Sequence, residues 1–377
     1  MIKNRVFIVF GDDWGRYPTT LQHIMKRFLP NNKFIWIGSL GLRKPKLKIA
    51  DIFRIIEKIN KFIKKEEKNT REPNITVLHP FIFPFHNFSF FRNLNKRTLI
   101  KKIKQTLFNL NYKDPIIITT QPIIGDVLNN LGEKSSHYFC QDDYTQFEGA
   151  YKIIDKLEKE MLKKISTCFA VAQHLMETRI PANGNVFYLP QGVDTSHFKL
   201  IKTKNVKPTI GFFGLLSPEW INLQLLLKVV KRYPEYDFLL IGRTTFDNNV
   251  FEGFHNLKYI GEVPYKELPT FAEKFTVGLI PFPISGLTKS CNPLKLLEYF
   301  ALGLPVVSTN IPAVNKFKDF LFIGQTEEDF INLIPKAILA NNEQENFARR
   351  NIAEKYSWQS IAENISAEIE TFENLKN

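Results

Sequence analysis

The sequence predicts an α/β protein made of two facing Rossmann-like domains with parallel sheets and a deep cleft between them. Short β-branched runs alternate with helical patterns along the chain, an order typical of parallel sheets covered by helices on both faces. The alternation starts afresh near residue 209, and 377 residues suffice for two domains of ordinary size.

The first domain is expected to span residues 1–198. Apolar runs that end in glycine or polar residues predict its strands, and apolar residues at helical spacing predict its helices. The expected strands are 5–11, 33–38, 115–120, 137–143, 167–172 and 185–194, and the expected helices are 17–29, 51–67 and 155–165.

The second domain is expected over residues 199–355, after a charged, proline-containing joint at 198–208. The same patterns predict strands at 209–216, 237–243, 257–263, 277–282 and 305–309, and helices at 222–234 and 293–302. Residues 356–377 are expected to form a last helix, with Ser357 as a candidate N-cap, that could cross back to the first domain.

Positive charge is concentrated in the first third of the chain. The net charge is +13, and residues 1–113 hold 24 basic and 7 acidic side chains. Such a field attracts phosphates, whether on anionic lipid, nucleic acid or a diphosphate-bearing substrate. A lysine-rich source proteome is the alternative explanation, but such a bias would raise the positive charge of both halves of the chain alike.

Three cysteines (Cys140, Cys168 and Cys291) are too few and too scattered for a disulfide framework or a metal site. The interpretation is a reduced, cytoplasmic compartment. The apolar run near the N-terminus is followed by acidic residues and resembles a first strand more than a signal peptide. No apolar run reaches the 18 residues that a membrane span needs.

Glycines stand at the ends of three predicted strands, at Gly11, Gly214 and Gly242. In doubly wound sheets such turns line the ligand crevice, where backbone amides and a helix N-terminus can approach a phosphate. Tight turns without a ligand are the alternative. The chain has neither a GxGxxG fingerprint nor a P-loop, which argues against a Walker-type ATPase.

Lys295 and Glu298 stand on one face of the apolar segment CNPLKLLEYFALGLPVVSTN, residues 291–310. Lys295 falls in the first helical turn, where a cation opposes the helix dipole, so an anion is expected beside it. Glu298, one turn on, could accept hydrogen bonds from the hydroxyls of a ribose. A solvated ion pair of a few tenths of a kcal/mol is the alternative.

The same segment resembles the nucleotide-sugar motif of GT-B glycosyltransferases. HYFCQDDY, YLPQGVDTSHF, GFFGLLSPEWINLQLL, LLIGR and LKYIGEVPYKELPTFAEKFTVGLIPF follow in the family's order, over most of residues 130–310 and more loosely 1–30. The chain is most similar to capsule, teichuronic-acid and exopolysaccharide enzymes, including the xanthan-type glucuronosyltransferase. Gln191 departs from the family's Asn or His before GVD.

The resemblance implies a nucleotide-sugar site in the second domain. In it, Glu298 would hold the ribose, Lys295 the diphosphate, and Glu262 the nucleotide. The further donor-site residues implied are Phe282 and Leu216 against base and sugar, Arg243 and Lys289 as added cations, and Gly214, Asn292, Pro293 and Leu294. Many retaining relatives carry a second glutamate eight residues before Glu298, where this chain has Ser290, so a retaining mechanism is in doubt.

The resemblance places the general base on Asp142, with Asp143 as the alternate. A carboxylate at a strand end can take the proton of an acceptor hydroxyl. An Asp-Asp turn that only caps the next segment is the competing interpretation. A single base predicts inversion at the anomeric carbon. No metal and no cofactor are expected, because cations and helix dipoles can neutralise the leaving diphosphate.

Two segments of the first domain are expected at the acceptor side. The first-strand loop would offer Gly11, Trp14, Gly15 and Arg16 to an acceptor or phosphate. Six phenylalanines followed by a cation suit a lipid-linked acceptor or the bilayer rim: Phe81, Phe83, Phe85, Phe88, Phe90, Phe91 and Arg92. For the phenylalanine-rich segment, the alternative is a set of core aromatic rings packed under a loop. The basic apolar stretch 44–65 could form a helix at a membrane surface, and ordinary packing on the sheet is the alternative for it.

The expected function is transfer of a sugar, most simply from a UDP-sugar, to a saccharide or lipid-linked saccharide in surface-polysaccharide assembly. The enzyme would lie in the cytoplasm at the inner face of the anionic cytoplasmic membrane. The alternatives are a GT-B-fold nucleotide-sugar epimerase and a basic nucleic-acid-binding protein. The latter lacks any RRM, KH or helix-turn-helix signature, so no nucleic-acid partner is expected.

Overall fold

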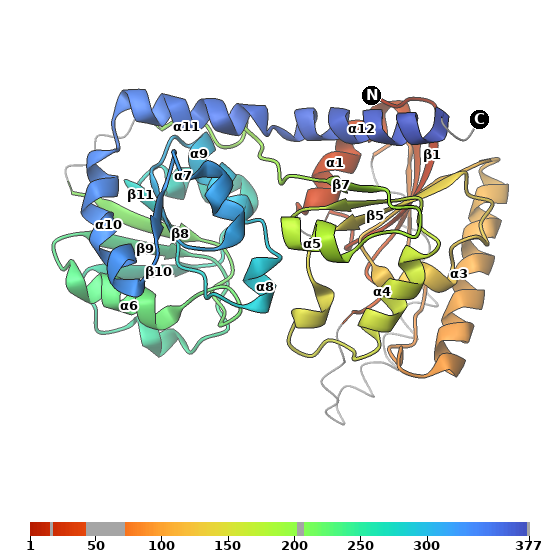
Figure 1. Cartoon of the computed structure of the whole chain (residues 1–377), viewed down its shortest axis with the longest axis horizontal. Coiled ribbons are helices and arrows are strands. Elements are labelled where there is room, and N and C mark those ends of the chain that lie inside the picture. Colours follow the sequence, from red (N-terminus) through yellow and green to blue (C-terminus); the bar gives the residue numbers. More distant parts are fainter. Residues whose placement is uncertain (16–17, 43–71, 202–206, 375–377) are drawn as a thin grey trace. The chain divides into compact units, whose positions relative to one another are not determined.

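The computed structural model describes residues 1–15, 18–42, 72–201 and 207–374 and divides into two compact units (Figure 1). Unit 1 comprises residues 1–189 and 362–377, and unit 2 comprises residues 190–361. The division falls after residue 189 rather than 198 because residues 190–198 bond within unit 2. The Val193 amide donates to the Tyr356 carbonyl over 2.9 Å, and Arg350 donates to the Phe198 carbonyl over 2.6 Å.

Unit 1 is a seven-stranded parallel sheet in the order β3-β2-β1-β4-β5-β6-β7. Strands β2 and β3 are added on one side of β1, and strands β4 to β7 on the other. Doubly wound sheets bind ligands at such a point, where the strand order reverses. The strands are β1 Val6–Phe10, β2 Lys33–Ile37, β3 Ile75–Leu78, β4 Ile116–Thr119, β5 Ser135–Cys140, β6 Thr167–Ala170 and β7 Val186–Tyr188.

Helices cover the sheet of unit 1, and short 3-10 turns follow several strands. The α-helices are α1 Thr20–Phe28, α3 Ser89–Asn109, α4 Ile154–Leu162, α5 Gln173–Thr178 and α12 Trp358–Asn374, and the 3-10 helices are η1 Leu29–Asn31, η2 Pro122–Asp126 and η3 Tyr144–Gln146. All residues of β4 and all of β1 except the half-buried Val6 are buried, as expected for central strands with helices on both faces.

Unit 2 is a six-stranded parallel sheet in the order β10-β9-β8-β11-β12-β13. The strands are β8 Thr209–Phe213, β9 Asp237–Ile241, β10 Leu257–Gly261, β11 Val277–Ile280, β12 Val306–Thr309 and β13 Phe322–Gly324. The helices are α6 Leu223–Arg232, α7 Leu268–Ala272, α8 Gly286–Lys289, α9 Leu294–Ala301, α10 Glu327–Leu339, α11 Glu343–Lys355, η4 Asn248–Phe251, η5 Tyr265–Glu267 and η6 Pro312–Phe317.

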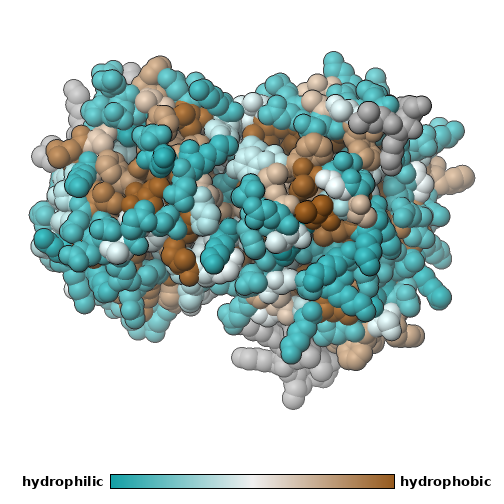
Figure 2. All heavy atoms as spheres, in the orientation of Figure 1, coloured by the Kyte–Doolittle hydropathy of each residue, from teal (hydrophilic) through white to brown (hydrophobic). Residues whose placement is uncertain are grey.

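The apolar residues of both units are gathered beneath the helices. On the face shown in Figure 2, hydrophobic groups appear as small patches among hydrophilic side chains. Close packing in unit 2 depends on missing side chains at two strand positions. A Cβ on Gly278 would lie 2.7 Å from the Tyr299 ring, and one on Gly211 would lie 2.2 Å from the Phe275 ring.

The prediction of two parallel sheets is confirmed, with corrections to several single elements. No bounds were predicted for β3, β13, α3, α5, α10 and α11, and the strand expected at 185–194 is only Val186–Tyr188. The Ser357 N-cap is confirmed, since its hydroxyl accepts a hydrogen bond from the Ser360 amide over 3.2 Å. The predicted helix 51–67 and the basic stretch 44–65 lie outside the described residues. No helix in the described ranges is long and apolar enough to cross a bilayer.

Candidate active site

Helix α9 is anchored against β8 in unit 2, which brings Lys295 to the end of that strand. Leu296, Leu297, Tyr299 and Phe300 are buried, and the Tyr299 hydroxyl accepts a hydrogen bond from the Phe213 amide over 3.3 Å. The first turn of α9 contains no acidic residue that would balance the lysine. The cation therefore stands at the positive end of a helix, next to the turn that follows β8.

Gly214 provides the space in which Lys295 lies. A Cβ at Gly214 would lie 2.1 Å from the Lys295 Cε and 2.6 Å from its Nζ, and the Gly214 φ of +140° also disfavours a side chain. Gly242, at the end of β9, packs equally closely, since its Cβ would lie 1.9 Å from the Gly214 carbonyl oxygen. The two glycines thus expose bare backbone beneath the ammonium group.

The charges of Lys295 and Glu298 are poorly solvated. Both side chains are half-buried, and the Lys295 Nζ lies 5.5 Å from the centre of the Phe212 ring and 5.8 Å from that of Phe282. Burial lowers the pKa of Lys295, against the attraction of Glu298. Burial raises the pKa of Glu298 to about 7, against the attraction of Lys295. Such perturbed groups are typical of functional sites.

Within unit 2, two buried hydroxyls have no hydrogen-bond partner among the described residues. They belong to Ser290, between α8 and α9, and to Ser217, after the β8 turn. Buried polar atoms are nearly always paired, so a ligand or water is the expected partner of each. Ser290 occupies the position of the missing glutamate, and nothing in the sequence pattern pointed to Ser217.

The other predicted donor residues differ in exposure. Leu216, Phe282 and Pro293 are buried, Asn292 and Leu294 are half-buried, and the Leu216 amide donates to the Arg243 carbonyl over 2.9 Å. The side chains of Arg243, Lys289 and Glu262 are exposed. The structure therefore joins Gly214, Phe282 and Lys295 in one cluster, and the roles of the three exposed residues stay predictions.

In unit 1, Asp142 and Asp143 follow β5, and the two have different surroundings. Asp143 is buried, pairs with the Arg179 guanidinium at 2.8 Å, and accepts hydrogen bonds from the Thr145 amide and hydroxyl over 3.1 and 2.6 Å. These contacts all engage one carboxylate oxygen and hold the group against Arg179, so it is less available to an acceptor hydroxyl than a free carboxylate would be. Asp142 is half-buried at the same strand end and is the stronger candidate base.

A buried network behind Asp143 was not predicted. Arg179 also donates from Nε to Glu158 over 3.2 Å, and Glu158 accepts a second bond of 2.5 Å from the Tyr138 hydroxyl. Burial raises the pKa of Glu158, against the lowering effect of Arg179. The sequence signal was an acid on the apolar face of α4, beside Leu157 and Met161.

The first-strand loop is held by its neighbours. The Gly15 amide donates to the Gln22 side chain over 3.1 Å, and the Trp14 ring meets the Trp36 ring edge-on at 4.7 Å. A Cβ at Gly11 would lie 2.7 Å from the Leu21 side chain. These contacts give the loop a defined shape. Arg16 lies outside the described residues.

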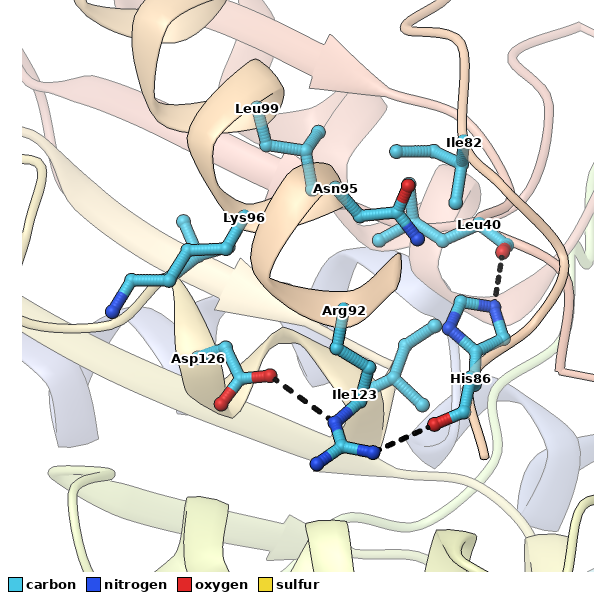
Figure 3. Close-up of a pocket in the computed structure, with 10 residues that line it drawn as sticks. Leu40, Ile82, His86, Arg92, Asn95, Lys96, Leu99, Ile123 and Asp126 are labelled. Atoms are coloured by element: carbon cyan, nitrogen blue, oxygen red, sulfur yellow. Dashed lines mark hydrogen bonds and ion pairs between the residues drawn. The ribbon is translucent and has the colours of Figure 1, made fainter. Parts of the chain in front are cut away.

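A pocket with about 320 Å³ of open space, part of it open to solvent, lies in unit 1 beyond the carboxyl ends of β2, β3 and β4 (Figure 3). Its polar residues are His86, Arg92, Asn95, Lys96 and Asp126. Arg92 donates to the His86 carbonyl over 2.9 Å and lies 3.8 Å from Asp126. Burial lowers the pKa of His86, against the raising effect of its hydrogen bond to the Leu40 carbonyl, which favours the neutral ring.

The phenylalanine-rich segment is divided between packed and exposed rings. Phe81, Phe83, Phe85 and Phe91 are half-buried and contact one another at ring-centre distances of 4.8 to 5.5 Å. Phe88 and Phe90, at the start of α3, are 60% and 71% exposed. The interpretation as core aromatics fits the four packed rings. A role at a lipid surface stays a prediction for the two exposed rings, Phe88 and Phe90.

Comparisons with known proteins show which sequences and folds this chain is similar to. Residues 207–339 match the family model "Glycosyl transferases group 1". TuaH of Bacillus subtilis (strain 168), provisionally named a teichuronic acid biosynthesis glycosyltransferase, is 30% identical over 166 residues. That match covers 41% of this chain and 41% of the relative, so the chain spans less than half of that protein's length.

Solved structures of similar fold cover nearly the whole chain. Sucrose-phosphate synthase of Thermosynechococcus elongatus superposes with a TM-score of 0.73 at 11% identity, over 98% of this chain and 99% of the other. HepE of Anabaena, solved with UDP-glucose, superposes with a TM-score of 0.67 at 14% identity, over 97% and 99%. Identities this low establish the fold alone. On this basis, residues 207–339 are similar to the group 1 glycosyl transferases, and the chain has the GT-B fold.

Proposed function

We propose that the chain transfers a sugar from a UDP-sugar to a saccharide or lipid-linked saccharide acceptor in surface-polysaccharide assembly. The observation that carries this proposal is the Lys295 ammonium lying on the bare backbone of Gly214, at the end of β8. A half-buried cation over a glycine turn suits a diphosphate, and Glu298 lies three residues on, where a ribose would follow.

The proposed reaction is a single displacement. The acceptor hydroxyl gives its proton to the Asp142 carboxylate as its oxygen attacks the anomeric carbon. The bond between that carbon and the diphosphate breaks, and UDP leaves with the bonding electron pair. Attack opposite the leaving group inverts the anomeric configuration. Asp143 is retained as the alternate base, although Arg179 holds it.

We propose that Lys295, the first turn of α9 and the backbone amides at Gly214 stabilise the leaving diphosphate without a metal or other cofactor. Burial lowers the pKa of Lys295, against the attraction of Glu298, and a bound phosphate would place a further negative charge beside the ammonium group. Ser217 and Ser290 offer hydroxyls to the same ligand. Exposed Arg243, Lys289 and Glu262 are proposed to contact the nucleotide or sugar at its outer side.

The acceptor is proposed to bind unit 1. The first-strand loop and the pocket of Figure 3 lie at the carboxyl edge of the sheet that also carries Asp142, since all seven strands run parallel. Exposed Phe88 and Phe90 beside Arg92 suit a lipid-linked acceptor. We propose a cytoplasmic enzyme that works at the inner, anionic face of the cytoplasmic membrane.

A thermal-shift panel of UDP-, GDP-, dTDP- and CDP-sugars tests the donor assignment, because a ligand that binds the folded state raises its melting temperature. The expected result is a rise with UDP and UDP-sugars that exceeds the rise with the other bases. No rise with any nucleotide would contradict the proposal. Conversion of a UDP-sugar to its epimer without any acceptor would instead favour the epimerase. A salt-sensitive gel shift with DNA would favour the nucleic-acid-binding protein.

A further inference from the structure

Helix α3 carries an outward stripe that begins at Phe90, already proposed to face a lipid-linked acceptor, and continues along residues for which the proposed active site has no role. In Figure 1, α3 is the long orange helix of unit 1. Its 21 residues include six cations and no acid. Asn95, Leu99, Ile103, Thr106 and Leu107 are buried on the side that packs against the unit. Several of the remaining residues of α3 are exposed in the described part of the chain.

One line of exposed residues combines apolar ends with a basic centre. Phe90, Leu94, Arg97, Lys101, Lys104 and Phe108 follow one another at spacings of four, three, four, three and four residues, so they share one helix face. Phe90 is 71% exposed, Leu94 37% and Phe108 86%. At 1.5 Å per residue the line is about 27 Å long. We call this set the α3 stripe.

Among the described residues, the charges of the α3 stripe have no partner, and its rings are mostly exposed to water. Arg97, Lys101 and Lys104 make no ion pair with a described residue, no acid on α3 balances them, and Phe90 contacts only the neighbouring Phe91 ring at 5.4 Å. Large aromatic side chains in water forfeit about 1.5–3 kcal/mol each relative to burial. A partner that fits must present negative charge along the centre of the line and accept apolar rings at both ends.

We infer that the α3 stripe docks the protein on an anionic phospholipid surface, with the helix lying flat. Lysine and arginine stems extend along apolar surface while their charged ends reach phosphates, and aromatic rings enter the boundary between headgroups and acyl chains. Nucleic acid would satisfy the cations but gives Phe90 and Phe108 nothing comparable at both ends of the line. The inference rests on the proposed function, whose lipid-linked acceptor lies in such a surface.

Vesicle co-sedimentation of the full chain tests the inference. The probes are phosphatidylcholine vesicles with and without phosphatidylglycerol, at physiological salt. Wild type should sediment with the anionic vesicles and not with the neutral ones. Arg97→Gln/Lys101→Gln/Lys104→Gln should lower the partition coefficient on the order of a hundredfold, from about fivefold per cation near an anionic surface. Phe90→Ser/Phe108→Ser should also reduce recovery.

A matched control removes the same charge elsewhere in unit 1. Lys3, Lys152 and Lys163 are exposed and lie outside α3. Lys3→Gln/Lys152→Gln/Lys163→Gln should bind anionic vesicles within about twofold of wild type, because charges away from the contact are screened. An equal loss in both triple variants would show a diffuse charge effect and overturn the inference. Equal recovery of wild type with neutral and anionic vesicles would overturn it too.

The same preparations separate this inference from the proposed function. Melting temperature with UDP is measured for wild type and both triple variants, since all three should keep the nucleotide site. A rise with UDP in every variant, with vesicle binding lost only in the α3 variant, supports both. A rise with UDP but tighter binding to single-stranded DNA than to anionic vesicles overturns the docking inference alone. If UDP does not raise the melting temperature of wild type, the proposed donor site is contradicted, whether or not the protein binds vesicles.

Discussion

At the scale of single residues, the candidate donor site depends on two glycines, which lack side chains, and on two poorly solvated charges, those of Lys295 and Glu298. Gly214 admits Lys295, and Gly242 admits the Gly214 backbone. Sequence alone placed all four residues near one ligand. It could not show that the lysine stem lies on the glycine, because that contact joins residues 81 positions apart in different elements.

Gly214→Ala should weaken UDP binding at least tenfold. The new methyl group would occupy the place of the Lys295 Cε, and displacing the ammonium removes a charge-assisted contact worth about 1.5–3 kcal/mol. Gly253→Ala is the control: Gly253 also has a positive φ, +80°, but its Cβ would meet nothing within 4 Å. Calorimetric titration with UDP checks both, and equal affinities would rule out the contact.

Glu298 should make the unliganded protein less stable as the pH rises. Its pKa is about 7 in the folded chain and 4.5 as the ordinary value. Between these values the folded state binds more protons than the unfolded state, so the stabilising effect, complete below pH 4.5, is lost as the pH rises through 7. Melting temperatures of wild type should therefore fall relative to Glu298→Gln between pH 5 and 8. Parallel curves would contradict the burial of this carboxyl group.

At the scale of elements, periodicity predicted nearly every strand and helix that lies near the candidate site. β8, β9, β11, β12 and α9 all appear within a few residues of their predicted bounds. α3 was missed because prolines and Asn87 interrupt the phenylalanine-rich run, and the helix begins only at Ser89. β3 was missed because it is a four-residue strand, ITVL, between polar segments.

The Arg179 network should stabilise unit 1 far more than a surface ion pair does. Arg179→Met leaves the buried carboxylates of Asp143 and Glu158 without their cation, a change that costs about 3–5 kcal/mol when a buried pair is broken. Lys159→Met, which removes an exposed pair with Asp155, should cost less than about 1 kcal/mol. Urea unfolding measures both. Similar losses would mean that the buried network is not a unit of stability.

At the scale of the whole molecule, the chain ends where it began, in unit 1. Buried Glu373 on α12 lies 3.5 Å from both the Arg5 Nε and the Lys134 Nζ, and accepts a 3.3 Å hydrogen bond from Ser135. These partners sit next to β1 and at the start of β5. A pattern of helical spacing predicts that 357–375 is a helix but cannot show which unit it packs against, because its partners are hundreds of residues away.

Glu373→Gln should speed amide hydrogen exchange in β1 and β5 and leave UDP binding unchanged. The substitution removes the charge that pairs with Arg5 and Lys134, an effect of about 1–2 kcal/mol for a buried, charge-assisted contact. Glu368→Gln, on the same helix and without these partners, is the control. Exchange unchanged by Glu373→Gln, or a loss of UDP affinity, would contradict this division of roles between the units.

The proposed function depends most on the binding of a nucleoside diphosphate by unit 2, and calorimetric titration measures the affinity for UDP directly. Lys295→Met with Glu298→Gln should weaken binding by more than about a hundredfold, since each removes a charge-assisted contact. The melting temperature without ligand should not fall, because two poorly solvated charges are lost. Lys318→Met with Glu328→Gln, both exposed in unit 2, is the matched control. UDP affinity equal to wild type in the Lys295 and Glu298 variant would contradict the account.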